Sequence, residues 1–180
     1  MKKVLSIMAV AAVMLFAGKA NAQLSIHAGY QSYSMTAETP MGSSTESNDG
    51  FYIGGSYNME AGAGLSVAPG LYFAYVEDIM DLRVPILINY GIKISDVRLS
   101  VFAGPQINFG VAGDMYDKDL TAPLEFSRFD LAATFGLQLG YRNISIEGGY
   151  SLGLLNRWSD APSSCSIKTN QLFFGVGYDL

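Results

Sequence analysis

From residue 24 to residue 180 the chain alternates between apolar residues and small or polar ones, position by position, in eight separate stretches. Successive side chains of a β-strand point to opposite faces, so a period of two predicts strands with one apolar face. Leu24-Ser25-Ile26-His27-Ala28-Gly29-Tyr30-Gln31 shows the pattern clearly. The expected strands cover residues 24–31, 51–58, 65–75, 82–92, 99–111, 128–141, 144–154 and 171–180.

The expected connections fall into two classes that alternate along the chain. Three of the four odd-numbered ones are long and polar, whereas every even-numbered one is short. Outer-membrane barrels sort their connections in this way, with short periplasmic turns and longer outer loops, whereas a soluble β-sandwich has no reason to do so. The odd-numbered connections are Ala37–Gly50, Glu77–Asp81, Asp114–Glu125 and Leu155–Asn170, and the even-numbered ones are Asn58–Gly64, Lys93–Val97 and Arg142-Asn143.

The size of the side chains predicts which face points outward. One face carries Leu, Ile, Phe and Tyr, and the other is rich in Gly, Ser and Ala. The interior of an eight-stranded barrel barely holds its own side chains, so the bulky face belongs outside, against lipid. The prediction is an all-β, closed antiparallel up-and-down transmembrane β-barrel of eight strands. A girdle of aromatic side chains is expected at the periplasmic rim, formed by Tyr57, Tyr90, Tyr141 and Tyr178.

The N-terminus predicts export. Lys2 and Lys3 precede an apolar run, and Ala20-Asn21-Ala22 has the small-x-small spacing of a cleavage site. We expect residues 1–22 to be a cleaved signal peptide and residues 23–180 to form the barrel domain; an uncleaved membrane anchor is the alternative. Removing the signal leaves 8 basic against 16 acidic residues. A net charge near −8 argues against nucleic-acid binding through a basic patch.

Three short segments carry a resemblance to a known family. Residues 82–90 (LRVPILINY), residues 102–105 (FAGP) and residues 69–72 (PGLY) are similar to stretches of PorT-like outer-membrane barrels. These proteins are widespread in the Bacteroidetes, and most have no assigned activity. The resemblance implies a location in the outer membrane of a Gram-negative cell envelope. It does not imply the secretion role of the family's namesake.

Two further features concern assembly. Gly175, Tyr178 and Leu180 resemble the terminal-strand signal read by the barrel assembly machinery, which is therefore an expected partner. Proline cannot donate to a β-ladder and is usually found at edges or bulges. Bulges or disrupted pairing, with a local change of facing phase, are therefore expected at Pro69, Pro85 and Pro105.

Charged residues at expected inward positions predict a network inside the lumen. Arg83 and Arg128 could pair with Asp130 or Glu147, because buried charges persist only when they are paired and hydrogen-bonded. The favoured interpretation is a structural network that fills the barrel, with a gate or proton path as the alternative. The outer loops are acidic, and Asp114, Asp117 and Asp119 are a weak candidate for binding Ca²⁺.

No catalytic motif stands out. The single histidine, His27, is expected inside the barrel near its periplasmic end, as a hydrogen-bonded lumen residue rather than a general base. The sequence therefore predicts neither an enzyme nor a cofactor. It favours a monomeric outer-membrane barrel in contact with lipid and lipopolysaccharide, with a filled lumen and a structural or recognition role for its acidic outer loops. The alternatives are a narrow porin-like channel and a soluble periplasmic barrel that binds a ligand as lipocalins do.

Overall fold

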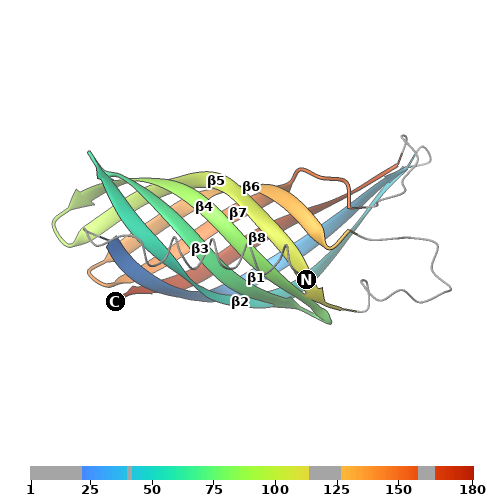
Figure 1. Ribbon diagram of the computed structural model, residues 1–180, viewed down its shortest axis with the longest axis horizontal. Coiled ribbons are helices and arrows are strands. Elements are labelled where there is room, and N and C mark those ends of the chain that lie inside the picture. Colours follow the sequence, from blue (N-terminus) through green and yellow to red (C-terminus); the bar gives the residue numbers. More distant parts are fainter. Residues whose placement is uncertain (1–21, 40–41, 114–126, 158–164) are drawn as a thin grey trace, which may run out of the picture.

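Eight antiparallel strands form one closed barrel in the computed structural model, which describes residues 22–39, 42–113, 127–157 and 165–180. Each strand pairs with its neighbours in the sequence, and the last strand pairs with the first (Figure 1). The fold class predicted from the sequence is confirmed. Within the described ranges no helix is long and apolar enough to cross a bilayer. The strands are β1 (Ala22–Thr39), β2 (Gly42–Gly62), β3 (Leu65–Val76), β4 (Ile79–Ile94), β5 (Val97–Ala112), β6 (Phe129–Tyr141), β7 (Ile144–Gly153) and β8 (Ser166–Asp179).

The two ends of the barrel differ in their connections. We call the end where β1 begins and β8 finishes the terminal end, and the opposite one the loop end (Figure 1). At the terminal end the two-residue turns 63–64, 95–96 and 142–143 join the strands. Ala63 and Gly64 have φ of 54° and 80°, the left-handed backbone of the tightest hairpin turns. The loop end has the two longest connections, 113–128 and 154–165.

The first hairpin of the loop end corrects the sequence prediction. Residues 37–50 were expected to be a long loop, but β1 and β2 remain paired from Gln31 and Gly50 out to Thr39 and Gly42. Hydroxyl pairs bridge the strands, Ser34 Oγ to Ser47 Oγ at 2.8 Å and Thr36 Oγ1 to Thr45 Oγ1 at 3.1 Å. Because the segment is polar on both faces, it has no hydrophobic period by which a strand could be detected.

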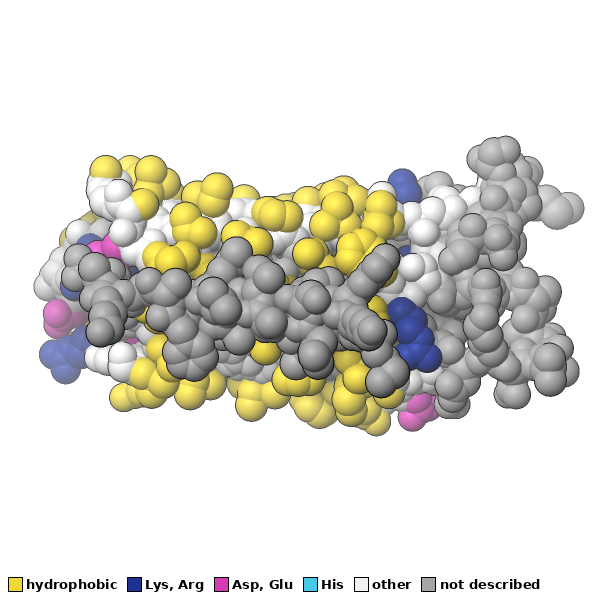
Figure 2. Space-filling model, in the orientation of Figure 1, with side chains coloured by type: hydrophobic (Ala, Val, Ile, Leu, Met, Phe, Trp, Pro, Cys, Tyr) yellow, Lys and Arg dark blue, Asp and Glu magenta, His cyan; other side chains and the backbone are white. Residues whose placement is uncertain are grey.

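The apolar face points outward along the whole barrel. Leu137 and Phe174 are 59% and 54% exposed, whereas Gln31 and Ser66 on the inward face are fully buried. Hydrophobic side chains form a band around the middle of the molecule, with charged side chains beyond it at both ends (Figure 2). Tyr90, Tyr141 and Tyr178 lie exposed on this outer face, and Tyr57 is half-buried there; their role as an aromatic girdle stays a prediction. A lipocalin-like barrel with its apolar face inward is ruled out.

The three prolines interrupt pairing without changing the facing phase. Near each of Pro69, Pro85 and Pro105, two residue pairs are missing from the ladder with the preceding strand, and the same register resumes beyond the gap. The predicted disruption is therefore confirmed, but the predicted phase shift is wrong. Proline removes one donor and inserts no residue, so the side chains keep their alternation. The register shifts that do occur lie elsewhere, at Glu60/Gly62 and Met80/Asp81.

Four aromatic rings fill the middle of the barrel, and we call them the aromatic layer: Tyr52, Tyr72, Phe102 and Phe173. Their ring centroids lie 6.0–6.3 Å apart, with Phe173 in contact with both Tyr52 and Phe102. Glycines on neighbouring strands make the room for them. A Cβ on Gly149 would lie 2.5 Å from Cζ of Phe173, and a Cβ on Gly136 would collide with the Phe102 ring. The inward glycines are thus a packing requirement of the aromatic layer.

Candidate functional site

The aromatic layer divides the polar lumen into two clusters with different chemistry. The cluster toward the loop end is rich in charged and amide side chains, and we call it the loop-end cluster. The cluster toward the terminal end is centred on the only histidine and borders an open vestibule. All of these side chains come from inward positions of the strands, except one arginine that enters from a connection.

The loop-end cluster combines two arginines with two aspartates. Arg83, Asp81, Asp130 and Arg157 are each at most 5% exposed, and their formal charges cancel. Arg83 Nη1 donates to Gln31 Oε1 at 2.5 Å. Amides and hydroxyls on β5 to β8 extend the cluster through a chain of hydrogen bonds that links Asp130, Asn108, Gln106, Gln171, Thr134 and Ser151.

Arg157 closes the loop end from the connection between β7 and β8. Its guanidinium donates to the hydroxyl of Tyr33 and, at 3.2 Å, to the carbonyl oxygen of Ser127. Its backbone nitrogen donates to the carbonyl oxygen of Ile167, and its carbonyl accepts from the nitrogen of Ser127. The side chain also interacts electrostatically with Asp130. One residue therefore joins the barrel wall to two connections.

The predicted charge network is partly wrong. Arg83 and Asp130 lie in the loop-end cluster as expected, but Glu147 lies on the other side of the aromatic layer, where it contacts His27. Arg128 is exposed at the rim, and its Nη1 is 3.4 Å from the carbonyl oxygen of Val111. The sequence prediction extends the alternation to Arg128, which is one residue before β6 begins at Phe129. Sequence reasoning missed Arg157. This residue lies in the polar connection between β7 and β8, where no alternation of apolar and polar residues indicates which side chains point inward.

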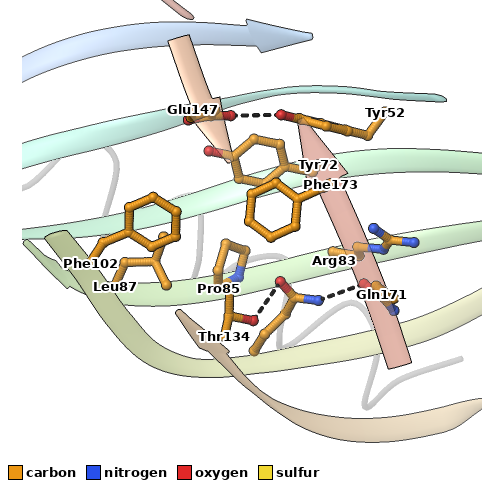
Figure 3. A pocket seen from close by; sticks show the side chains of 11 residues that line it. Tyr52, Tyr72, Arg83, Pro85, Leu87, Phe102, Thr134, Glu147, Gln171 and Phe173 are labelled. Atoms are coloured by element: carbon orange, nitrogen blue, oxygen red, sulfur yellow. Dashed lines mark hydrogen bonds between the residues drawn. The ribbon is translucent and has the colours of Figure 1, made fainter. Parts of the chain in front are cut away.

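A chain of hydrogen bonds surrounds His27 on the other side of the aromatic layer. Its Nε2 lies 2.9 Å from Ser56 Oγ, and its Nδ1 lies 3.1 Å from Glu147 Oε2. The hydroxyl of Tyr52 donates to the second carboxylate oxygen of Glu147 at 2.7 Å. Figure 3 shows the Tyr52–Glu147 contact above the rings of the aromatic layer. The lumen position predicted for His27 is confirmed.

Two adjoining spaces flank this histidine cluster. The terminal-end vestibule is lined by Ser25, His27 and Ser56 among others. A smaller cavity lies among the aromatic layer and the side chains of Pro85, Arg83 and Gln171 (Figure 3). The residues that line both spaces are Tyr72, Leu87, Phe102 and Glu147.

The calcium candidate and most of the signal segment lie outside the described residues. This applies to Asp114, Asp117 and Asp119, and to Ala20, whereas Ala22 is the first residue of β1. Within the described part of the chain, no group of three or more His, Cys, Asp or Glu side chains could hold a metal ion.

Comparisons with known proteins show the fold. No protein-family model matches the chain, and no curated protein matches it. Among solved structures it is similar to neisserial surface protein A (NspA), with a TM-score of 0.51 and 14% identity over 86% of this chain and 97% of that one. It is also similar to the outer-membrane enzyme PagL, with a TM-score of 0.52 and 14% identity over 81% of this chain and 97% of that one. The chain thus has the fold of small eight-stranded barrels of bacterial outer membranes.

The similarity to PagL corrects one conclusion drawn from the sequence. The sequence has no recognisable catalytic motif and predicts that the chain is not an enzyme. Since an outer-membrane enzyme has this fold, that exclusion is wrong: an eight-stranded barrel is compatible with catalysis. Any catalytic group must be sought in the side-chain geometry, because the fold is shared by proteins of different function.

Replacing Arg157 by alanine is expected to destabilise the barrel far more than replacing Arg128. Loss of Arg157 leaves the buried cluster with two aspartates and one arginine, so that one negative charge, nearest to Asp130, is no longer compensated, at a cost of about 3–5 kcal/mol. Arg128→Ala removes an exposed side chain and is expected to change stability by less than about 0.5 kcal/mol. Denaturant unfolding in detergent, followed by heat-modifiable gel migration, measures both. Equal midpoints for the two variants would contradict the assignment of Arg157 to the loop-end cluster.

Proposed function

We propose that the protein is an integral outer-membrane barrel with a sealed lumen that presents a recognition surface at its loop end. The observation that carries this proposal is the sorting of side chains, with an apolar band outside and a packed, hydrogen-bonded interior. Lipid is the solvent that such an exterior requires, because a closed barrel satisfies its own backbone hydrogen bonds. The loop end then faces outward and the terminal end faces the periplasm.

Two successive layers support the sealing of the lumen. The aromatic layer occupies the middle of the barrel, and the loop-end cluster lies between it and the outer surface. Side chains of this size fill the bore of an eight-stranded barrel. The narrow channel remains the alternative, in which the charged residues of the loop-end cluster would line an ion path.

The β1–β2 hairpin supports a recognition role. Together with β8, which pairs with β1 as far as Glu38 and Ser166, it extends beyond the β3–β4 turn (Figure 1). Among the described residues, the β2 segment 42–49 pairs only with β1, so one edge of this projecting sheet presents backbone donors and acceptors. Such edges bind extended partner segments as an added strand. Acidic side chains on and beside this edge favour a positively charged partner: Glu46, Asp49, Glu77 and Asp78.

The finer assignments rest on sequence features. They comprise cleavage of residues 1–22, insertion by the barrel assembly machinery through the C-terminal strand, a monomeric state, and contact with lipopolysaccharide. The similarity of residues 82–90 to PorT-like barrels supports kinship with that family. A location in the outer membrane is common to all of these proposals.

The sealed lumen predicts electrical silence in planar bilayers. The full-length barrel is expected to give no stepwise openings, because the aromatic layer blocks the bore. A Tyr52→Ala/Phe173→Ala double variant removes two of the four rings but leaves the loop-end cluster in place, and is also expected to be silent. Heat-modifiable migration of the protein recovered from the membranes is the control for insertion. Regular stepwise openings by the unaltered protein would favour the channel instead.

The proposed orientation predicts which ends are accessible on cells. A short epitope tag inserted between β1 and β2 is expected to bind antibody on intact cells. The matched tag, inserted at the two-residue turn between β4 and β5, is expected to bind antibody only after permeabilisation. Binding of antibody to the second tag on intact cells would contradict the orientation, and failure of both tags after permeabilisation would contradict insertion.

A further inference from the structure

We propose that Ser56, His27 and Glu147 form a hydrolytic site that opens into the terminal-end vestibule and cleaves short-chain carboxylic esters. This inference goes beyond the proposed function and is independent of it. It rests on the geometry of the terminal-end cluster, and not on a sealed bore or a recognition surface.

The hydrogen-bond pattern fixes the role of each nitrogen of His27. An ionised carboxylate only accepts hydrogen bonds, so the contact of 3.1 Å between Nδ1 and Glu147 requires a proton on Nδ1. In a neutral imidazole the other nitrogen is then unprotonated. Nε2, at 2.9 Å from Ser56 Oγ, is thus an acceptor for the hydroxyl proton. A nucleophile, a base and a residue that orients the base are joined in the order that hydroxyl activation requires.

Glu147 is a positioning residue that reaches His27 across an intervening strand. His27 lies on β1 and Glu147 on β7, and Gly177 of β8 pairs with His27 between them. A Cβ on Gly177 would lie 3.0 Å from Nδ1 of His27, so a side chain there would crowd this contact. The hydroxyl of Tyr52 holds the other oxygen of Glu147 at 2.7 Å. The carboxylate is therefore fixed from two sides.

The vestibule gives a substrate access to Ser56. Ser56 and His27 both line it, together with the polar side chains of Asn58, Asn89 and Arg98. Asn58 stands two residues after Ser56 on the same face of β2, and its side-chain amide supplies the donor for a developing oxyanion in this scheme. On the inner side, Leu87 and Phe102 line both the vestibule and the cavity beyond it. The apolar wall that these two side chains form is the proposed contact surface for a short acyl group.

The reaction proceeds in two balanced steps. Ser56 Oγ forms a bond to the carbonyl carbon of the ester while its proton moves to His27 Nε2. The bond from that carbon to the alcohol oxygen then breaks, and the alcohol departs with the proton from Nε2, which leaves an acyl-serine. Water next adds to the acyl carbon and gives its proton to Nε2. The carboxylic acid departs as the proton returns to Ser56 Oγ. Glu147 stabilises the imidazolium in both steps.

A fluorophosphonate probe tests the proposal directly, because it forms an adduct only with activated hydroxyls. The full-length barrel, folded in detergent, is expected to gain one adduct, which peptide mapping places on Ser56. The adduct is expected to be lost in Ser56→Ala, and labelling is expected to be at least about 100-fold slower in His27→Gln. Hydrolysis of p-nitrophenyl acetate is expected to fall in the same two variants. Heat-modifiable migration confirms that each variant is folded.

Other inward serines of the barrel serve as controls for the labelling of Ser56. Ser25 and Ser145 line the vestibule but contact Asp179 and Gln138 rather than the histidine, and neither is expected to be labelled. Ser151→Ala removes an inward serine of the loop-end cluster and is expected to leave labelling of Ser56 unchanged. No adduct on the unaltered protein, equal labelling of Ser25 and Ser56, or an adduct on Ser56 that persists at full rate in His27→Gln would each overturn the proposal.

Discussion

The interior volume of an eight-stranded barrel is the constraint on which the rest of this structure depends. The bore has room for large side chains only where neighbouring inward positions carry none. Phe173 occupies the space left by Gly149, and Phe102 the space left by Gly136. Most of the leucines and isoleucines lie outside and make the exterior apolar. The apolar exterior and the packed interior are thus two results of one limit on volume.

The aromatic layer separates two kinds of polar chemistry. Toward the loop end, balanced charges and amides form a hydrogen-bonded cluster, and Arg157 ties it to two connections. Toward the terminal end, His27 and Ser56 face an open vestibule. Burial of charge is tolerated in the first region because each arginine has acidic neighbours. In the second region His27 contacts Glu147, and this contact orients the histidine toward Ser56.

The sequence predicts this structure correctly only in segments where apolar and polar residues alternate. Wherever the outer face of a strand is apolar, the alternation predicted the correct facing of its residues, as for His27 and Arg83. It failed at Arg128, one residue before β6, and in residues 37–50, where both faces of the hairpin are polar. It also could not pair His27 with Glu147, although both were assigned inward positions. That contact depends on register and on the missing side chain of Gly177, which lies between them.

The central claim, that neighbouring residues of one strand face lipid and lumen, is tested most directly at Phe173 and Phe174. Each is replaced in turn by tryptophan in a Trp158→Phe background, and the protein is folded into vesicles of brominated phospholipid, which quenches tryptophan on contact. Phe174 is 54% exposed on the outer face, whereas Phe173 packs against Phe102 inside. The account predicts strong quenching at 174 and little at 173. Equal quenching at both positions, or stronger quenching at 173, would contradict it.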